Sequence, residues 1–423
     1  MLTMKQGVPP LAQFLWLAIL VAMLFSPFAL LSISVGALLV VAVFELECHP
    51  FRIRLRPQVL DRLANWRQYP DYFAITLSFW IVLLSFWQTY DWTYWFIRLQ
   101  VKASFLVLPL AFLFLPAFSR RAVHQLFYGL LGLLTLGNSV ILYHFCQDVA
   151  DSLQGLKMGQ PMWTPIHHIR YSLLLALAVV GGVQLLRVKH YWRLPAERWL
   201  IGLLTLLAFI FVHFLAVKSG ILMLYVGLAT LVLHYIVMSR RWLSGLGLLV
   251  LLSVVPVISY HSFPTLRNKV LYTIHDFKMY AAGQGGTYSD SGRLAALKAG
   301  WQIVQARPVL GVGAGNLRHA MAVKFDEQYP DYIEKFMPPN QFLFVWAGTG
   351  LWGLALFLIA FFFPLFYRRH YRDAFFLAFY AMQFVSILIE HSLENVLGIV
   401  HYCFFTLLLL KSMPGEEARW VKA

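Results

Sequence analysis

Charged residues are scarce in this sequence. Of its 423 residues, 60% are hydrophobic and 16% aromatic, whereas only 13% are charged. Soluble globular proteins carry about 25% charged residues, because their surfaces contact water. The scarcity excludes a soluble enzyme of this size, a disordered chain and a coiled coil, and it predicts that lipid is the solvent for most of the chain.

Cysteine is also rare, since the chain has only three. Three thiols cannot make a disulfide framework, and their spacing matches no metal-binding motif. One run of acidic residues lacks a histidine and a D-x-D pair, and such runs are usually solvated helix faces. We therefore expect no metal and no cofactor. The acidic run consists of Asp326, Glu327, Asp331 and Glu334.

Basic residues are more plentiful than acidic ones. The 34 Lys and Arg against 19 Asp and Glu give a net charge of +15. These cations are scattered between apolar runs instead of forming one stripe, which argues against nucleic-acid binding. The balance favours contact with anionic membrane lipids or an anionic substrate, and it suits a positive-inside topology.

Apolar runs of spanning length recur along the whole chain. They predict an all-α integral membrane protein with about twelve transmembrane helices. The first run is followed by no A-x-A cleavage site and by another apolar run, so we expect it to be retained as a span. The runs cover residues 11–25, 28–46, 72–88, 103–118, 123–146, 171–187, 199–217, 219–238, 242–261, 341–366, 374–390 and 395–410.

Basic residues are concentrated in alternate connections, which predicts that both termini lie in the cytoplasm. The sequence then divides into spans one to nine (1–261), a large polar loop (262–340), and spans ten to twelve with a cytoplasmic tail (341–423). The large loop and a shorter connection, 147–170, lie on the non-cytoplasmic side. Long loops with structure of their own are usually functional, so the active face is expected there.

The centre of the large loop has clear helix and turn signals. Ser289-Asp290-Ser291 offers N-cap residues for an amphipathic helix that ends at Arg307-Pro308. A glycine-rich turn, Gly311 to Asn316, follows. It is either a cradle of backbone N–H groups for phosphate or a tight connection that needs positive φ angles. No strand precedes it, so it is no dinucleotide fingerprint.

Two motifs carry a resemblance to a known family. Arg293, Trp301 and the stretch Pro308-Val309-Leu310-Gly311-Val312-Gly313 resemble the "R…W…P-L-x-G-x-G" signature of the O-antigen ligase/polymerase superfamily. The second signature, H-N-x-x-L followed by G-x-x-G, is similar to the segment from Asn340 to Gly353. With twelve spans and a large loop between spans nine and ten, the resemblance covers essentially the whole chain. It implies a GT-C-like glycosyltransferase with a helical periplasmic loop.

The resemblance also implies a reaction. An O-antigen ligase transfers polysaccharide from undecaprenyl diphosphate to a sugar hydroxyl of lipid A–core, in the periplasm at the bacterial inner membrane, and so completes lipopolysaccharide. The leaving lipid diphosphate must be neutralised, and arginine suits this because its planar fork makes bidentate, permanently charged contacts. We expect an inverting, metal-independent mechanism.

Cations on the external side are the candidates for diphosphate binding. Arg293 is in the signature and at the first turn of a helix, where the helix dipole does not favour a positive charge. Lys218 stands at a short external turn where family members often have an Arg-Gly sequence. Arg170 opens span six after a proline-containing loop and is a candidate equal to Lys218. Weaker candidates are Arg267 and Lys269, for which a headgroup contact is the alternative, and Arg318.

The catalytic base is the one departure from the family pattern. The family has a histidine just before the asparagine of the second signature, whereas this chain has Pro339. His319 is a weak substitute, and His167 and His168 are weaker. We expect the chain to be much less active than the Pro339→His variant; equal rates would mean that the base lies elsewhere.

Polar residues near the external ends of the last spans are candidates for binding the acceptor sugar. Asn340 and Gln341 could orient a sugar through their amides, although an N-cap explains Asn340 equally well. The others, Glu390, His391 and Glu394, contact the acceptor sugar, complete a proton path, or are merely solvated at a turn.

Other functions remain open at this stage. An O-antigen polymerase or a protein O-oligosaccharyltransferase of the same superfamily differs only in its acceptor. A transporter of lipid-linked glycans is disfavoured, because the chain has no inverted-repeat signal and its candidate residues lie on one face and not at mid-membrane.

Overall fold

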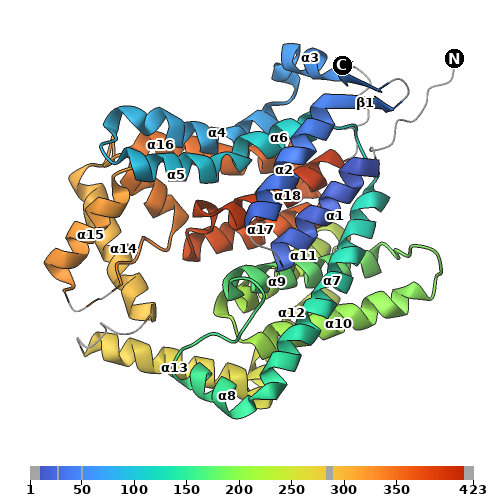
Figure 1. The fold of residues 1–423 in the computed structure, drawn as a ribbon. Coiled ribbons are helices and arrows are strands. Elements are labelled where there is room, and N and C mark those ends of the chain that lie inside the picture. Colours follow the sequence, from blue (N-terminus) through green and yellow to red (C-terminus); the bar gives the residue numbers. More distant parts are fainter. Residues whose placement is uncertain are drawn as a thin grey trace.

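The computed structural model describes residues 10–25, 28–48, 51–282, 289–330, 332 and 334–413. These residues form an all-helical membrane bundle with one small hairpin, β1 (Phe44–Cys48) paired with β2 (Phe51–Leu55) (Figure 1). Eight helices are long and apolar enough to cross a membrane, and four shorter apolar helices accompany them. The predicted fold class is therefore confirmed.

Twelve apolar helices correspond one to one to the predicted runs. They are α1 (Pro10–Phe25), α2 (Phe28–Val43), α4 (Pro70–Leu84), α6 (Ser104–Phe114), α7 (Arg120–Gln147), α9 (His168–Arg187), α10 (Glu197–Leu215), α11 (Lys218–Ser239), α12 (Trp242–Ser262), α16 (Gln341–Phe366), α17 (Ala374–Ile389) and α18 (Val396–Lys411).

The fourth span differs from its predicted bounds. It begins at Trp92 with α5 (Trp92–Lys102) and continues through α6 to Phe114, whereas the apolar run predicts a start at residue 103. Arg98 and Lys102 interrupt the apolar pattern, so the pattern misses this part. Both side chains are buried, with 7% and 4% exposed.

Packing sorts the helices into central and peripheral ones. α18 is buried along nearly its whole length, and α17 packs against α11 and α9 beside it (Figure 1). α4 packs against α16 and α6, whereas α1 and α2 form a pair. α12 buries little of its surface in the bundle, so most of its apolar side chains face lipid.

The large connection between α12 and α16 is itself helical. It contains α13 (Pro264–Ala281), α14 (Ser289–Ala306) and α15 (Leu317–Gln328), and α13 packs against α8 (Val149–Lys157) of the shorter connection. Figure 1 shows these four helices together at one end of the molecule. We call this end the loop face.

The segment from Pro308 to Val312 is hydrogen-bonded to α16 around Gly350. α16 is kinked at Gly350, whose φ of 71° and ψ of −168° are available to glycine alone. At the kink, the amide of Leu351 donates to the carbonyls of Pro308 (3.0 Å) and Val309 (3.1 Å). One turn earlier, Val312 N donates to Ala347 O over 3.0 Å. The glycine-rich turn and the residues just before it are thus a packed connection. Their carbonyl and amide groups form hydrogen bonds with the backbone of α16 at its kink.

Replacing Gly350 by alanine is expected to lower the thermal unfolding midpoint in detergent. A Cβ at this position would collide with the backbone carbonyl of Val309, and the backbone conformation alone costs about 1–3 kcal/mol for a residue other than glycine. Gly132→Ala is the matched control, because Gly132 lies inside α7 with no heavy atom near the added Cβ. The control should be neutral or stabilising; equal losses in both variants would contradict this account.

Candidate functional site

Two adjoining cavities open on the loop face. One has a volume of about 560 Å³ and the other of about 320 Å³. Both are lined by His167, Ile169, Arg293 and Glu390, so these residues stand at the boundary between them. We call them the larger and the smaller cavity.

The lining of the larger cavity combines ionisable and apolar residues. Arg170, Arg293, Glu390 and His391 supply ionisable groups, and Asn395 adds an amide. The apolar lining comes from the membrane helices α1, α2 and α18. Its residues are Ala22, Leu31 and Leu397. The cavity therefore offers cations and lipid-like surface to one ligand.

Arg293 is held at the first turn of α14 by the helix before it. Asp276 of α13 is fully buried, accepts a hydrogen bond from the amide of Asp290 (2.9 Å) and contacts the hydroxyl of Ser291. This carboxylate caps α14, as an acidic group at a helix N-terminus should. Arg293 then reaches Glu390 beyond the end of α17, with 2.8 Å between Nη2 and Oε1. The Arg293 side chain is 38% exposed, so it is accessible from the cavities.

Arg170 is the second guanidinium of the larger cavity. It lies in the first turn of α9. Its Nη1 is buried and has no hydrogen-bond partner among the described residues. A buried, unsatisfied charged donor is costly unless a ligand completes it. The helix N-terminus adds backbone N–H groups and a positive dipole, so this corner favours an anion.

The smaller cavity is lined by two lysines and two histidines. Lys218 pairs with Asp290 (Nζ to Oδ2, 2.5 Å), and Lys269 donates to the carbonyl of Gly159 (2.8 Å). Burial lowers the pKa of Lys269, and the neighbouring charge of Lys218 lowers it further, whereas Asp290 opposes the shift. The cavity is thus basic but partly neutralised by two carboxylates, Asp290 and Glu390.

His167 and His168 lie where the connection after α8 enters α9. Their rings stack with centroids 4.5 Å apart, and both line the smaller cavity. Burial lowers the pKa of His167, and Arg170 lowers it further, while Glu390 raises it. A lowered pKa keeps this imidazole neutral near pH 7.

Two of the predicted diphosphate-binding cations and the substitute base lie outside both cavities. Arg267 is exposed on α13, and Arg318 is exposed on α15 over the ring of Tyr94. His319 is also exposed and contacts Tyr90 edge to face, with ring centroids 6.0 Å apart. The structure therefore does not bring these cations or this substitute base to the place where Arg293 and Arg170 meet.

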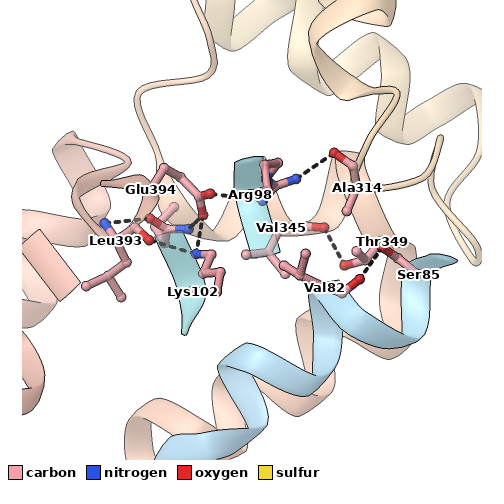
Figure 2. A network of polar contacts seen from close by, with 10 residues as sticks. Val82, Ser85, Arg98, Lys102, Ala314, Val345, Thr349, Leu393 and Glu394 are labelled. Carbon is pink, nitrogen blue, oxygen red and sulfur yellow. Dashed lines mark hydrogen bonds and ion pairs between the residues drawn. The ribbon is translucent and has the colours of Figure 1, made fainter. Parts of the chain in front are cut away.

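Glu394 belongs to a buried polar network (Figure 2). It lines neither the larger nor the smaller cavity, only a void of about 10 Å³. It accepts hydrogen bonds from Arg98 Nη2 (2.9 Å), Lys102 Nζ (2.7 Å) and Gln341 Nε2 (2.6 Å). Burial raises its pKa, but Lys102 and Arg98 outweigh burial and lower the pKa to about 2. The carboxylate is a permanent charge that holds α5 and α16 together.

Gln341 is completed by the same network. Its carbonyl accepts from the amide of Leu393 (3.0 Å), its amide donates to Glu394, and the residue has no exposed surface. Asn340 caps α16 by accepting from Leu343 N (2.9 Å), and it donates to Leu388 O (2.9 Å). The structure corrects the prediction for Gln341 and Glu394, because buried and fully bonded groups cannot contact a sugar. For Asn340 it favours the N-cap.

Arg98 and Lys102 are functional-looking residues that the apolar pattern missed. Arg98 also donates to the carbonyl of Ala314 (2.8 Å) in the glycine-rich turn. Nearby, the Asn316 amide accepts from Tyr90 N (3.0 Å) and donates to Gln88 O (2.7 Å). Cations inside an apolar helix imply a buried partner. The sequence therefore indicates that Arg98 and Lys102 have a partner, but it does not identify Glu394 as that partner.

The acidic run faces solvent. Asp326 pairs with Lys335 (2.6 Å) and Glu327 with Lys324 (2.6 Å), and all four side chains are at least 31% exposed. Asp331 lies outside the described residues. Within the described part of the chain, no three His, Cys, Asp or Glu residues are grouped as ligands of a metal ion.

The fold and the site define a multi-pass membrane protein with a basic cavity that also has an apolar wall. A family model described as O-antigen ligase matches residues 203–358, from α10 into α16. No curated protein matches the chain. Over this segment the chain is similar to the O-antigen ligase family. The matched segment contains Lys218, Lys269 and Arg293, whereas Arg170, Glu390 and His391 lie outside it.

Proposed function

We propose that this protein is an O-antigen ligase. It transfers a glycan from undecaprenyl diphosphate to a sugar hydroxyl of lipid A–core on the periplasmic side of the bacterial inner membrane. The observation that carries the proposal is the larger cavity, whose lining combines Arg170 and Arg293 with Ala22, Leu31 and Leu397. A polyprenyl diphosphate has this same division into an anionic head and an apolar tail.

The chemistry places demands on each group. The acceptor oxygen attacks the anomeric carbon, and the bond from that carbon to the diphosphate oxygen breaks. Negative charge then grows on the diphosphate, and the guanidinium groups of Arg170 and Arg293 stabilise it through charge-assisted hydrogen bonds. Lys218 and Lys269 of the adjoining cavity add positive charge beside Arg293. Attack opposite the leaving group inverts the anomeric configuration.

Topology supports the assignment of sides. The loop face carries the connections that the positive-inside rule places outside the cytoplasm. The large helical connection between α12 and α16 contributes Arg293 to the site. The donor is therefore expected to bind from the periplasmic leaflet, with the acceptor approaching from the periplasm.

Reconstitution tests the proposal. Purified protein in liposomes is given undecaprenyl-diphosphate glycan and lipid A–core, with and without EDTA, and the products are separated by gel electrophoresis. We expect glycan on lipid A–core at the same rate in both arms. Loss of product with EDTA would overturn the metal-independent mechanism, and absence of transfer to lipid A–core would overturn the ligase assignment.

The same assay separates the sister functions. Elongation of the lipid-linked donor in the absence of lipid A–core would identify a polymerase. Transfer to serine or threonine of an acceptor protein would identify an O-oligosaccharyltransferase. These outcomes differ only in the acceptor and leave the role of the larger cavity unchanged.

A further inference from the structure

Position 339 cannot supply a base in this protein. Pro339 has no ionisable group, is buried, and is absent from the described lining of either cavity. The proposed transfer nevertheless releases a proton from the acceptor hydroxyl. A general base must lie within hydrogen-bond reach of that hydroxyl, directly or through one water molecule.

His391 is one of the two histidines that line the larger cavity. It lies two residues after the end of α17 and lines the larger cavity together with Arg170, Arg293 and Glu390. Its ring stacks on Phe344 of the first turn of α16, with centroids 5.6 Å apart. The backbone of Pro338, the residue before Pro339, raises the pKa of the imidazole by hydrogen bonding.

The imidazole has a ring nitrogen whose lone pair is available to accept a proton. Its Nδ1 is buried and has no hydrogen-bond partner among the residues that the structure describes. When one ring nitrogen donates its proton to a backbone carbonyl, the other carries the lone pair. The stacked Phe344, 2% exposed, and the Pro338 backbone hold the ring in one orientation.

We propose that His391 is the general base of the transfer, in place of the family histidine that Pro339 replaces. This inference rests on the proposed function. The lone pair of the imidazole takes the hydroxyl proton of the acceptor sugar while the hydroxyl oxygen bonds to the anomeric carbon. The electron pair of the breaking C–O bond leaves with the lipid diphosphate, and His391 carries the proton as an imidazolium until solvent removes it.

The surroundings suit both protonation states. Burial lowers the pKa of His391 below its ordinary value of 6.5, although the carboxylates of Glu394 and Glu390 oppose this shift. Arg170 lowers the pKa further, and the Pro338 backbone raises it. Arg293, which is paired with Glu390, and His167 line the same cavity as His391. The ring is neutral near pH 7, and two carboxylates stand ready to stabilise the imidazolium.

His391→Gln tests the inference. The variant keeps a side chain of similar size and should bind undecaprenyl diphosphate with unchanged Kd in detergent, because the arginines remain. Its kcat should fall on the order of 100- to 10,000-fold, which is the usual contribution of general acid–base catalysis. An equal fall in kcat for His319→Gln, or a His391→Gln variant that binds the donor and keeps full kcat, would overturn the inference.

The pH profile separates a base from a structural residue. For the wild type, kcat should fall as the pH drops below the pKa of His391, since only the neutral imidazole accepts a proton. His391→Gln should lose this acid limb. His167→Gln should keep it, whatever its effect on the rate; loss of the limb in that variant instead would assign the base to His167.

Pro339→His adds a second arm. If His391 already serves as base, restoring the family histidine should change kcat by less than about ten-fold. An increase on the order of 100-fold or more would show that the wild type lacks an effective base and would overturn the inference. If the wild type transfers glycan to no acceptor, the proposed function itself fails, an outcome distinct from an active wild type with an active His391→Gln variant.

Discussion

Arg293→Ala is expected to lower kcat for glycan transfer on the order of 100- to 1,000-fold. The loss is that typical of removing one donor that stabilises charge in a transition state. The guanidinium lines both cavities, is 38% exposed, and is paired with a single carboxylate, Glu390. It is therefore able to exchange that partner for a diphosphate. The initial rate of product formation in liposomes is the measurement.

Two further variants define what Arg293 contributes. Arg293→Lys keeps the charge but loses the planar fork, so its kcat should lie between those of the wild type and the alanine variant. Arg307→Ala is the matched control, because Arg307 follows the other end of the same helix and is exposed away from both cavities. Full activity of Arg293→Ala, or an equal loss in Arg307→Ala, would contradict the assignment.

Glu394→Gln is expected to lower the free energy of unfolding by about 3–5 kcal/mol. Removing one partner of a buried ion pair leaves the other charge uncompensated in a low-dielectric interior. Here two cations lose their partner together, since Arg98 and Lys102 are 7% and 4% exposed and both bond to Glu394. Unfolding in mixed detergent micelles, followed by tryptophan fluorescence, measures the change.

The control for this prediction is an exposed ion pair. Glu327→Gln breaks the pair with Lys324 on α15, where the glutamate side chain is 51% exposed. Such pairs contribute about 0–1 kcal/mol. Similar losses in the two variants would mean that the buried network adds no stability of its own.

The same carboxylate predicts a pH dependence. The pKa of Glu394 is about 2 in the folded protein against an ordinary value of 4.5, because Lys102 and Arg98 outweigh the effect of burial. Its contribution to stability is therefore complete above pH 4.5 and is lost as the pH falls toward 2. Unfolding midpoints measured across this window should decrease for the wild type more steeply than for Glu394→Gln.

Much of the fold could be predicted from the sequence, because lipid imposes a length and a polarity on every span. The twelve apolar runs correspond to twelve apolar helices. The start of the fourth span could not be predicted, since Arg98 and Lys102 look like loop residues when counted by polarity. Their partner Glu394 is 296 and 292 residues away along the chain, and no local pattern connects them.

The site was predictable in its residue types and less so in its geometry. Arg293, Arg170, Lys218, Glu390 and His391 were candidates, and the structure brings all five to two adjoining cavities. Sequence reasoning had no means to separate them from Glu394 and Gln341. All have suitable chemistry near the ends of spans, and only three-dimensional contacts show which polar groups are already bonded to protein.

Two ion pairs join the N-terminal part of α14 to the membrane helices, in addition to the cap that Asp276 provides. Lys218 pairs with Asp290, Arg293 pairs with Glu390, and Lys218 is 43% exposed. The other end of the large connection is held by buried neutral hydrogen bonds around Gly350 and Asn316. An arriving polyanion competes with Asp290 and Glu390 for their cations and leaves the neutral contacts intact. Donor binding would thus exchange the partners of these two cations, while the cap by Asp276 keeps the start of α14 in place.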